Sequence, residues 1–443
     1  EKAPDEGSPT PDCALQPCPV ALEIRAPRAD RHSMQQRRSL FLLAAGVACL
    51  LAAGCSSTTL QENPPPSAAP LAAMVGAPTD ADAVFKGLIA FVETARGVTF
   101  EQPPGLRVVG PGEATFAEAA DGDEWLRLDA SRYQALGVLD PDDPSDPCLP
   151  DGEGCDVLGY YDSVPDELVV SSTDDGWGPA VRATIVHELV HAVQERRGDL
   201  ARWDKIWRRD LEAADVFEAL LEGEATLVEN LYLDSLTARA RWLRWDEEVA
   251  LAGTEPSDAV PYFDYVSYYP YDEGARAVTD AYRAGGWPGV DALMADPPPT
   301  TEALEDSEAS ASSHEVVIEM PNLAVEGFEF VEDGRWGKND FDGYLLHDFP
   351  PDEPTGWGDD WYEVHWNGTT AVTVHLVRGD DAAATDRLTD ALLHLCQARG
   401  LGDGFSVLRE GPDLAFVASL DPVTTTRFHS QLAEQGFVTA GAC

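Results

Sequence analysis

The sequence predicts an α+β fold, with a mostly helical main domain that contains a small β-sheet and a small α+β domain at the C-terminal end. Long segments with apolar residues at helical spacing occupy the middle of the chain, and two short strand-like segments precede them. From residue 357 onward, strand-like and helical segments are mixed. The chain has 443 residues and 44% hydrophobic content, which is enough for one large and one smaller domain.

The charge balance narrows the classes of partner. Lys and Arg number 30 against 79 Asp and Glu, which gives a formal net charge of -49. A surface this acidic repels phosphate backbones, so we expect no binding of nucleic acid. The same surface favours solubility and could gather divalent cations.

The N-terminal segment predicts export. Arg37 and Arg38 precede an apolar run of 16 residues, Ser39 to Gly54, which is short for a membrane span of about 20 residues. The run ends in Leu-Ala-Ala-Gly-Cys55, which resembles the lipobox of bacterial lipoproteins. The resemblance implies that Cys55 is lipidated and anchors the chain to a membrane of the cell envelope, facing the periplasm or the exterior. An uncleaved signal anchor is the alternative, and it would also place the rest of the chain outside the cytoplasm.

These features divide the chain into six regions. We expect a non-native leader (1–33), a lipoprotein signal peptide (34–54), a flexible Ser-, Pro- and Ala-rich tether (55–78), the main domain (79–300), a linker (301–356) and the C-terminal domain (357–443).

Four cysteines remain after the leader and Cys55 are set aside. An even number in an oxidising compartment suggests two disulfides. We prefer Cys148–Cys155 and Cys396–Cys443, each within its own region, although four cysteines allow three pairings. No Cys-x-x-Cys occurs, so the spacing does not suggest a zinc site built from cysteines.

The predicted elements follow in chain order. An acidic loop at 140–156 could bind Ca²⁺, but its spacing misses the EF-hand pattern and a solvated loop is favoured. A β-hairpin at 157–172 leads to a helix that begins near Pro179 and ends near Gly198, a good C-cap. The other expected helices are 82–96, 211–245, 273–283, 386–399 and 425–435, and the other expected strands are Leu106–Gly110, Trp125–Asp129, 361–366, 371–379, 405–410 and 413–420.

The stretch Ile185–Gln194 (IVHELVHAVQ) carries the chemistry. On a helix, His187 and His191 lie one turn and about 40° apart, so both imidazoles can reach one ion. Glu188 projects beside them, while the remaining face of the helix is apolar. This is the His-Glu-x-x-His motif of zinc peptidases. A chance occurrence on a buried helix is the alternative.

A hydrolytic zinc site needs a third protein ligand. Glu222-Gly-Glu-Ala resembles the helical Glu-Gly-x-Ala segment of gluzincins, the group of thermolysin and the M1 aminopeptidases, which implies Glu222 as that ligand. Gly223 costs about 1 kcal/mol inside a helix, and we expect it to permit close packing against the His187 helix. The alternatives are Glu218 as the ligand, or a solvated acidic face shared by Asp215, Glu218, Glu222 and Glu229.

The resemblance also implies roles for other residues. Glu188 would be the general base. Tyr271 lies in the segment Tyr-Asp-Glu-Gly-Ala, which resembles the Tyr-x-x-Gly-Ala segment of gluzincins. In that family the tyrosine hydroxyl stabilises the reaction intermediate, which implies the same role for Tyr271. An aromatic packing cluster is the alternative for this tyrosine. The hairpin at 157–172 would pair with the substrate backbone. Thr226 stands where some members have an aspartate that orients the first histidine.

We expect His365 and His375, which lie outside the motif, to be ordinary surface or hydrogen-bonded residues.

The sequence therefore predicts an exported, lipid-anchored zinc metallopeptidase with a zincin-like catalytic domain, acting on a peptide or protein substrate with Zn²⁺ as its cofactor. Two other functions stay open. One is a zinc amidase acting on cell-wall peptide, and the other is a non-catalytic surface binding lipoprotein with a structural metal. A structural site would be closed by a fourth protein ligand.

Overall fold

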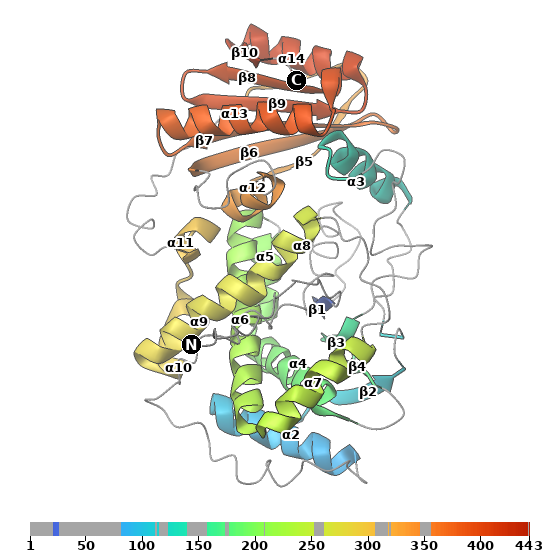
Figure 1. The fold of residues 1–443 in the computed structure, drawn as a ribbon, viewed down its shortest axis with the longest axis vertical. Coiled ribbons are helices and arrows are strands. Elements are labelled where there is room, and N and C mark those ends of the chain that lie inside the picture. The colour runs from blue at the N-terminus through green and yellow to red at the C-terminus, as the bar shows by residue number, and fades with distance from the viewer. Residues whose placement is uncertain are drawn as a thin grey trace, which may run out of the picture.

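The computed structural model shows a helical body below a second, sheet-based part (Figure 1). It describes residues 21–25, 81–110, 113–114, 123–139, 157–172, 177–207, 209–251, 261–305, 318, 320–345, 356–441 and 443. The chain is thus α+β, as predicted. Cys55, the tether, the acidic loop at 140–156 and the proposed Cys148–Cys155 disulfide lie outside the described residues.

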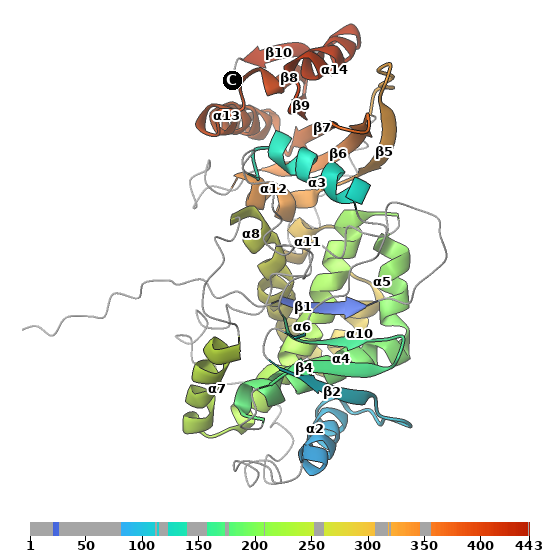
Figure 2. The same cartoon turned by 90° about the vertical axis from the view of Figure 1, so that its right-hand side faces the viewer.

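The small sheet of the helical body has the strand order β1-β3-β4-β2. Its centre is the predicted hairpin, in which β3 (Val157–Asp162) and β4 (Glu167–Ser171) pair antiparallel. The strand β2 (Gly105–Val109) runs parallel to β4. The other edge is covered by β1 (Ala21–Arg25), which is labelled in Figure 2. This strand runs parallel to β3. The segment 1–33, predicted as a leader, therefore contributes a strand to this sheet.

Two long buried helices form the centre of the body. The helix α4 (Pro179–Arg197) begins with a proline at its first turn and ends at Gly198, whose φ of 82° closes it, as predicted. It buries every residue from Ala180 to Gln194 and packs against α6 (Leu211–Ser235). The surrounding helices are α2 (Ala81–Arg96), α5 (Asp199–Trp207), α7 (Ala238–Leu251), α8 (Pro261–Tyr269), the π-helical turn η5 (Pro270–Gly274), α9 (Ala275–Gly285), α10 (Trp287–Ala295) and α11 (Thr301–Glu305).

Two sequence predictions of secondary structure are wrong. The segment Trp125–Asp129, predicted as a strand, belongs to the helix α3 (Asp123–Ala135), because Leu128, Arg132 and Ala135 share one buried helical face. The helix predicted at 211–245 is two helices. It breaks after Ser235, and the Thr237 hydroxyl accepts a hydrogen bond from the Ala240 N–H at the start of α7.

The sheet-based part is larger than predicted. Its six strands have the order β10-β8-β9-β7-β6-β5, and all neighbours pair antiparallel. The predicted strands and helices are present as β6 (Trp357–Trp366), β7 (Ala371–Gly379), α13 (Ala382–Ala398), β8 (Phe405–Glu410), β9 (Asp413–Ser419) and α14 (Pro422–Glu434). A 3₁₀ turn, η7 (Gly402–Gly404), precedes β8, and the strand β10 (Val438–Gly441) was not predicted. The edge strand β5 (Glu329–Gly334) and the helix α12 (Gly337–Leu345) come from the segment predicted as a linker.

Helices cover both faces of the large sheet. One face packs against α3, α12 and α13, and the other packs against α14 and the apolar residues Leu323 and Val325. The predicted Cys396–Cys443 disulfide is present and joins α13 to the end of the chain. The helices α3 and α8 both come from the segment predicted as the main domain, and both contribute residues to the core of the sheet-based part. This part is therefore assembled from three separate stretches of the sequence.

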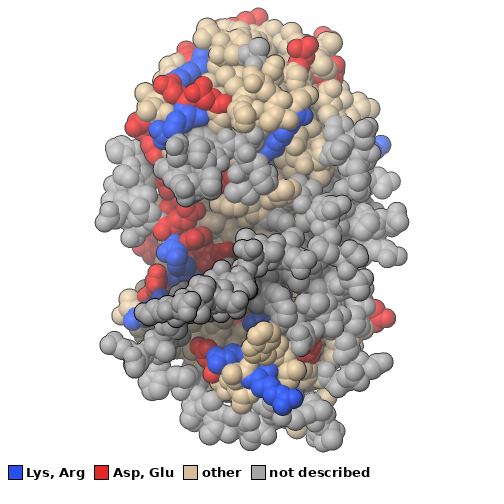
Figure 3. Space-filling view, viewed as in Figure 1, with Lys and Arg blue, Asp and Glu red and all other residues tan. Residues whose placement is uncertain are grey.

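Charge is distributed unevenly over the surface. On the face drawn in Figure 3, acidic side chains gather along one side of the middle of the molecule, with basic side chains among them. No helix in the described part of the chain is both long and apolar enough to span a bilayer.

Candidate metal centre

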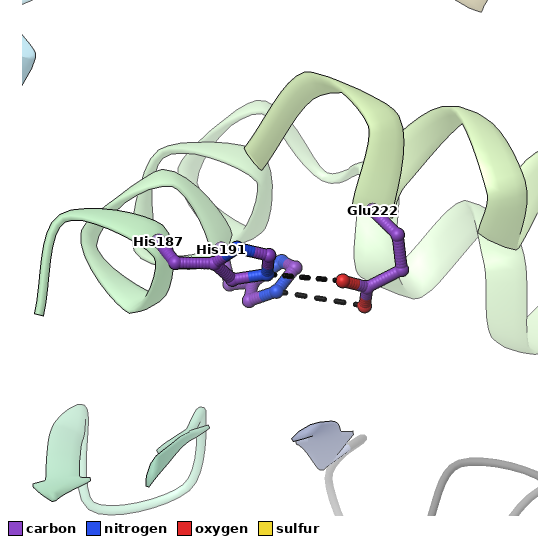
Figure 4. Close-up of side chains that lie close together, drawn as sticks. All are labelled: His187, His191 and Glu222. Atoms are coloured by element: carbon purple, nitrogen blue, oxygen red, sulfur yellow. Dashed lines mark hydrogen bonds and ion pairs between the residues drawn. The ribbon is translucent and has the colours of Figure 1, made fainter. Parts of the chain in front are cut away.

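Two helices bring three metal-ligand side chains to one point. His187 and His191 project from α4, and Glu222 projects from α6 toward them (Figure 4). The His187 Nε2 atom lies 3.0 Å from Glu222 Oε2, and the His191 Nε2 atom lies 3.5 Å from Glu222 Oε1. Donor atoms of the three residues all lie within 4.8 Å of one another, and all three side chains are buried. The structure thus brings together the three residues predicted as ligands.

Each imidazole also makes a polar contact through Nδ1, the ring nitrogen that points away from Glu222. His187 Nδ1 lies 3.1 Å from a carboxylate oxygen of Glu229, and His191 Nδ1 lies 2.8 Å from the side-chain oxygen of Gln194. Arg244 approaches the other oxygen of Glu229 at 3.3 Å. Both histidines therefore present Nε2 to the shared point, and hydrogen bonds to the opposite nitrogen hold the rings in place.

The side chain of Glu188, next to His187 on α4, is fully buried. Neither of its carboxylate oxygens has a hydrogen-bond partner within the described structure. Burial raises the pKa of Glu188 to about 7, although the two histidines oppose that rise. A carboxylate with a pKa near neutrality suits a general base, because it can both accept and return a proton.

Tyr271 reaches the site from a third element, η5. Its ring centroid lies 6.1 Å from that of His187, and its buried hydroxyl lies near the Glu222 carboxylate. Burial and the nearby carboxylates of Glu222 and Glu218 raise its pKa well above the usual value. The hydroxyl therefore stays protonated and can serve as a donor.

The position of Tyr271 depends on two glycines. A Cβ atom on Gly223 would lie 2.3 Å from the carbonyl oxygen of Gly274, and a Cβ atom on Gly274 would lie 1.9 Å from the carbonyl oxygen of Ala219. Gly223 therefore allows close packing against η5, and our prediction that it packs against the His187 helix is wrong. The contact brings the turn that carries Tyr271 against the helix that carries Glu222.

The acidic stripe of α6 is not a solvated face. Glu218, Glu222 and Glu229 are 9%, 0% and 7% exposed, because α6 is enclosed on nearly all sides. Glu218, the alternative third ligand, is not in the three-residue group. Burial and the charge of Glu222 raise the pKa of Glu218 to about 8.

The three ligand side chains shift one another's pKa values strongly. Burial opposes the ionisation of Glu222, but the two histidines outweigh it and lower its pKa to about 2. Burial likewise opposes protonation of His187, but Glu222 and Glu229 raise its pKa to about 10. The histidine protons occupy the place that a cation would take, and cation binding would displace them.

Three supporting residues were missed by the sequence analysis. Glu229, named before only as part of the acidic face of α6, follows Glu222 by two helical turns and contacts His187, the role that the family resemblance implied for the position of Thr226. Gln194 follows His191 by three residues, so helical spacing was the available signal. Glu224 lies beyond Gln194 and carried no recognisable signal.

The histidines outside the site, His365 and His375, are buried against Glu363 and Asp360, in line with an ordinary structural role.

Comparison with protein-family models, curated proteins and solved structures returns no match for this chain.

Proposed function

We propose that this protein is a zinc-dependent metallopeptidase of the gluzincin type. The observation that carries the proposal is the convergence of His187, His191 and Glu222 from two helices beside the unpaired carboxylate of Glu188. Two imidazoles and one carboxylate, with no fourth ligand in the group found among the described residues, are the donor set of a catalytic zinc site with an open position.

Two of the three donor separations are compatible with one shared metal ion. Ligand atoms that bind one tetrahedral zinc at 2.0–2.1 Å lie roughly 3.4 Å apart. The two nitrogen–oxygen separations here are 3.0 and 3.5 Å. His191 Nε2 and Glu222 Oε1 are buried and face each other at 3.5 Å, so a cation bound between them would contact both.

The residues of the site divide the work of peptide hydrolysis. Zinc, when bound, polarises the scissile carbonyl and acidifies a water molecule. Glu188 accepts the proton of the attacking water and later delivers it to the leaving amine. Tyr271 donates a hydrogen bond to the oxygen that gains negative charge in the transition state.

The small sheet supports a substrate site. Gly159 in β3 lies against α4, since a Cβ atom there would come within 2.8 Å of Thr184 Cγ2, one turn before Glu188. This places β3 directly against the helix of the metal centre. Because β1 pairs along the edge of β3, an extended peptide could add to β3 by backbone hydrogen bonds only in place of β1.

The location of the protein is part of the proposal. The lipobox-like sequence before Cys55 supports a lipid anchor and a place in the cell envelope. Metabolic labelling with a fatty acid should mark the wild-type chain and leave Cys55→Ser unmarked. Equal labelling of the two chains would contradict the anchor.

The activity is tested by zinc content and peptide cleavage. Wild type, Glu188→Gln and the control Glu195→Gln, a change on the same helix, are assayed against a mixed peptide library. We expect one bound zinc in all three and a loss of at least about 10²-fold in kcat only in Glu188→Gln. Wild type without zinc would overturn the proposal. Zinc binding without peptide cleavage would instead indicate a structural metal or, if cell-wall peptide is cleaved, an amidase.

A further inference from the structure

Behind His191, the contact with Gln194 continues into a buried chain of polar residues that reaches Glu224 and two arginines. Gln194 accepts from His191 at 2.8 Å and donates to the Glu224 carboxylate at 3.0 Å. Glu224, which is 0% exposed, is held by two arginines from different helices, Arg96 in α2 and Arg197 in α4.

The arginines fix the charge and position of Glu224. One carboxylate oxygen accepts from Arg96 Nε at 2.5 Å and from Arg197 Nη1 at 2.8 Å. The other accepts from Arg197 Nη2 at 2.5 Å as well as from Gln194. A buried carboxylate with four charge-assisted or amide donors is an acceptor only.

Glu224 in turn fixes the orientation of the Gln194 amide. The Gln194 Nε2 group donates to two acceptors, Glu224 Oε2 at 3.0 Å and the Leu221 carbonyl oxygen at 2.8 Å. A flipped amide would place its oxygen against both acceptors and lose both bonds. The amide oxygen must therefore face His191.

We propose that Gln194 and Glu224 form a positioning relay that selects the metal-binding tautomer of His191. Because Gln194 presents only an oxygen, His191 Nδ1 must carry a proton, and Nε2 then offers its lone pair to the cation. This inference rests on the proposed metal site. The relay differs from the support of His187, which is a direct carboxylate contact with Glu229.

The zinc affinity of Gln194 variants tests the relay. Gln194→Leu keeps the approximate volume but removes the acceptor, so we expect its zinc Kd to rise about 10- to 100-fold. Gln194→Glu keeps an oxygen facing His191 and, as the carboxylic acid, can still donate to Glu224 or to the Leu221 carbonyl oxygen, so we expect its zinc Kd to rise less than that of Gln194→Leu. The control Gln431→Leu removes an amide that bonds only the backbone of Ala324, far from the site, and should leave the Kd unchanged.

The outcomes separate the relay from the metal site itself. Equal zinc affinity in wild type and Gln194→Leu would overturn the relay and leave the proposed function intact. Equal losses in the Leu and Glu variants would show a packing role and also overturn it. Wild type that binds no zinc would remove both proposals. If Gln194→Leu does not fold, ¹⁵N NMR of the zinc-loaded wild type decides, because an unprotonated His191 Nδ1 contradicts the relay.

Discussion

The backbones of Gly223 and Gly274 meet where α6 crosses the turn that carries Tyr271. A Cβ atom on Gly223 would lie only 2.3 Å from the Gly274 carbonyl oxygen, which is backbone and cannot rotate away. The residue that follows Glu222 thus decides how closely a third element approaches the metal centre. The Glu222-Gly223 pair thus supplies both a candidate ligand and the backbone contact that positions Tyr271.

Substitution of Gly223 should therefore loosen the site. We expect Gly223→Ala to lower the free energy of unfolding by roughly 1–3 kcal/mol, because overpacking outweighs the gain in helix propensity. Gly285→Ala is the matched control, since a Cβ atom there meets no atom within 4 Å. Denaturant unfolding measures both, and an unchanged or raised stability of Gly223→Ala would show that the crossing is not tight.

Removal of the Tyr271 hydroxyl should reduce catalysis but not zinc binding. We expect Tyr271→Phe to lower kcat by about 10²- to 10³-fold, as loss of one oxyanion donor does, with the zinc Kd unchanged. Tyr269→Phe is the control, because its hydroxyl donates to the Thr301 carbonyl oxygen instead. Steady-state kinetics compare the variants, and similar losses in both would assign Tyr271 to aromatic packing.

Occupation of the β3 edge by β1 should limit activity. Because β1 runs along the strand proposed to receive substrate, we expect the full chain to have a lower kcat/KM than a chain that begins at residue 56. Both proteins are assayed with the same peptide and matched for zinc content. Equal kcat/KM values would mean that β1 does not compete with substrate.

The buried carboxyl of Glu212 should make stability depend on pH. It accepts from the Thr301 N–H at 2.7 Å, is 0% exposed, and burial raises its pKa well above the usual value. Above about pH 4.5 the unfolded state releases this proton while the folded state keeps it, so stability falls as pH rises toward the folded-state pKa. We expect a slope that is smaller in Glu212→Gln by up to about 1.4 kcal/mol per pH unit.

The control for that measurement is Glu434→Gln, which changes an exposed carboxyl at the end of α14. Its unfolding free energy should follow the wild-type curve between about pH 5 and 8. Parallel curves for all three proteins would mean that Glu212 does not carry the dependence.

The Cys396–Cys443 disulfide should stabilise the sheet-based part alone. It closes a loop of 47 residues, so we expect Cys443→Ser to lower the free energy of unfolding by about 2–4 kcal/mol. Zinc affinity should stay unchanged, because the disulfide lies in the sheet-based part and the metal centre lies in the helical body. Calorimetry and zinc titration test both statements, and a weaker zinc affinity would instead link the two parts.

Local patterns determined several features of this protein without any tertiary information. Helical periodicity placed His187, Glu188 and His191 on one face, and Pro179 and Gly198 marked the ends of their helix, because these signals act within a few residues. Glu222 and Tyr271 came from family resemblance, and the structure brings both near the histidines.

Contacts between distant segments decided the rest. The burial of the α6 carboxylates, the Gly223–Gly274 crossing and the link from Gln194 to Glu224 and its arginines join residues from two or more elements. Trp125–Asp129 alternates like a strand, yet it lies in a helix because Leu128 and Arg132 pack against the large sheet. Such pairings depend on which faces meet in the folded chain, and no pattern confined to one segment records that choice.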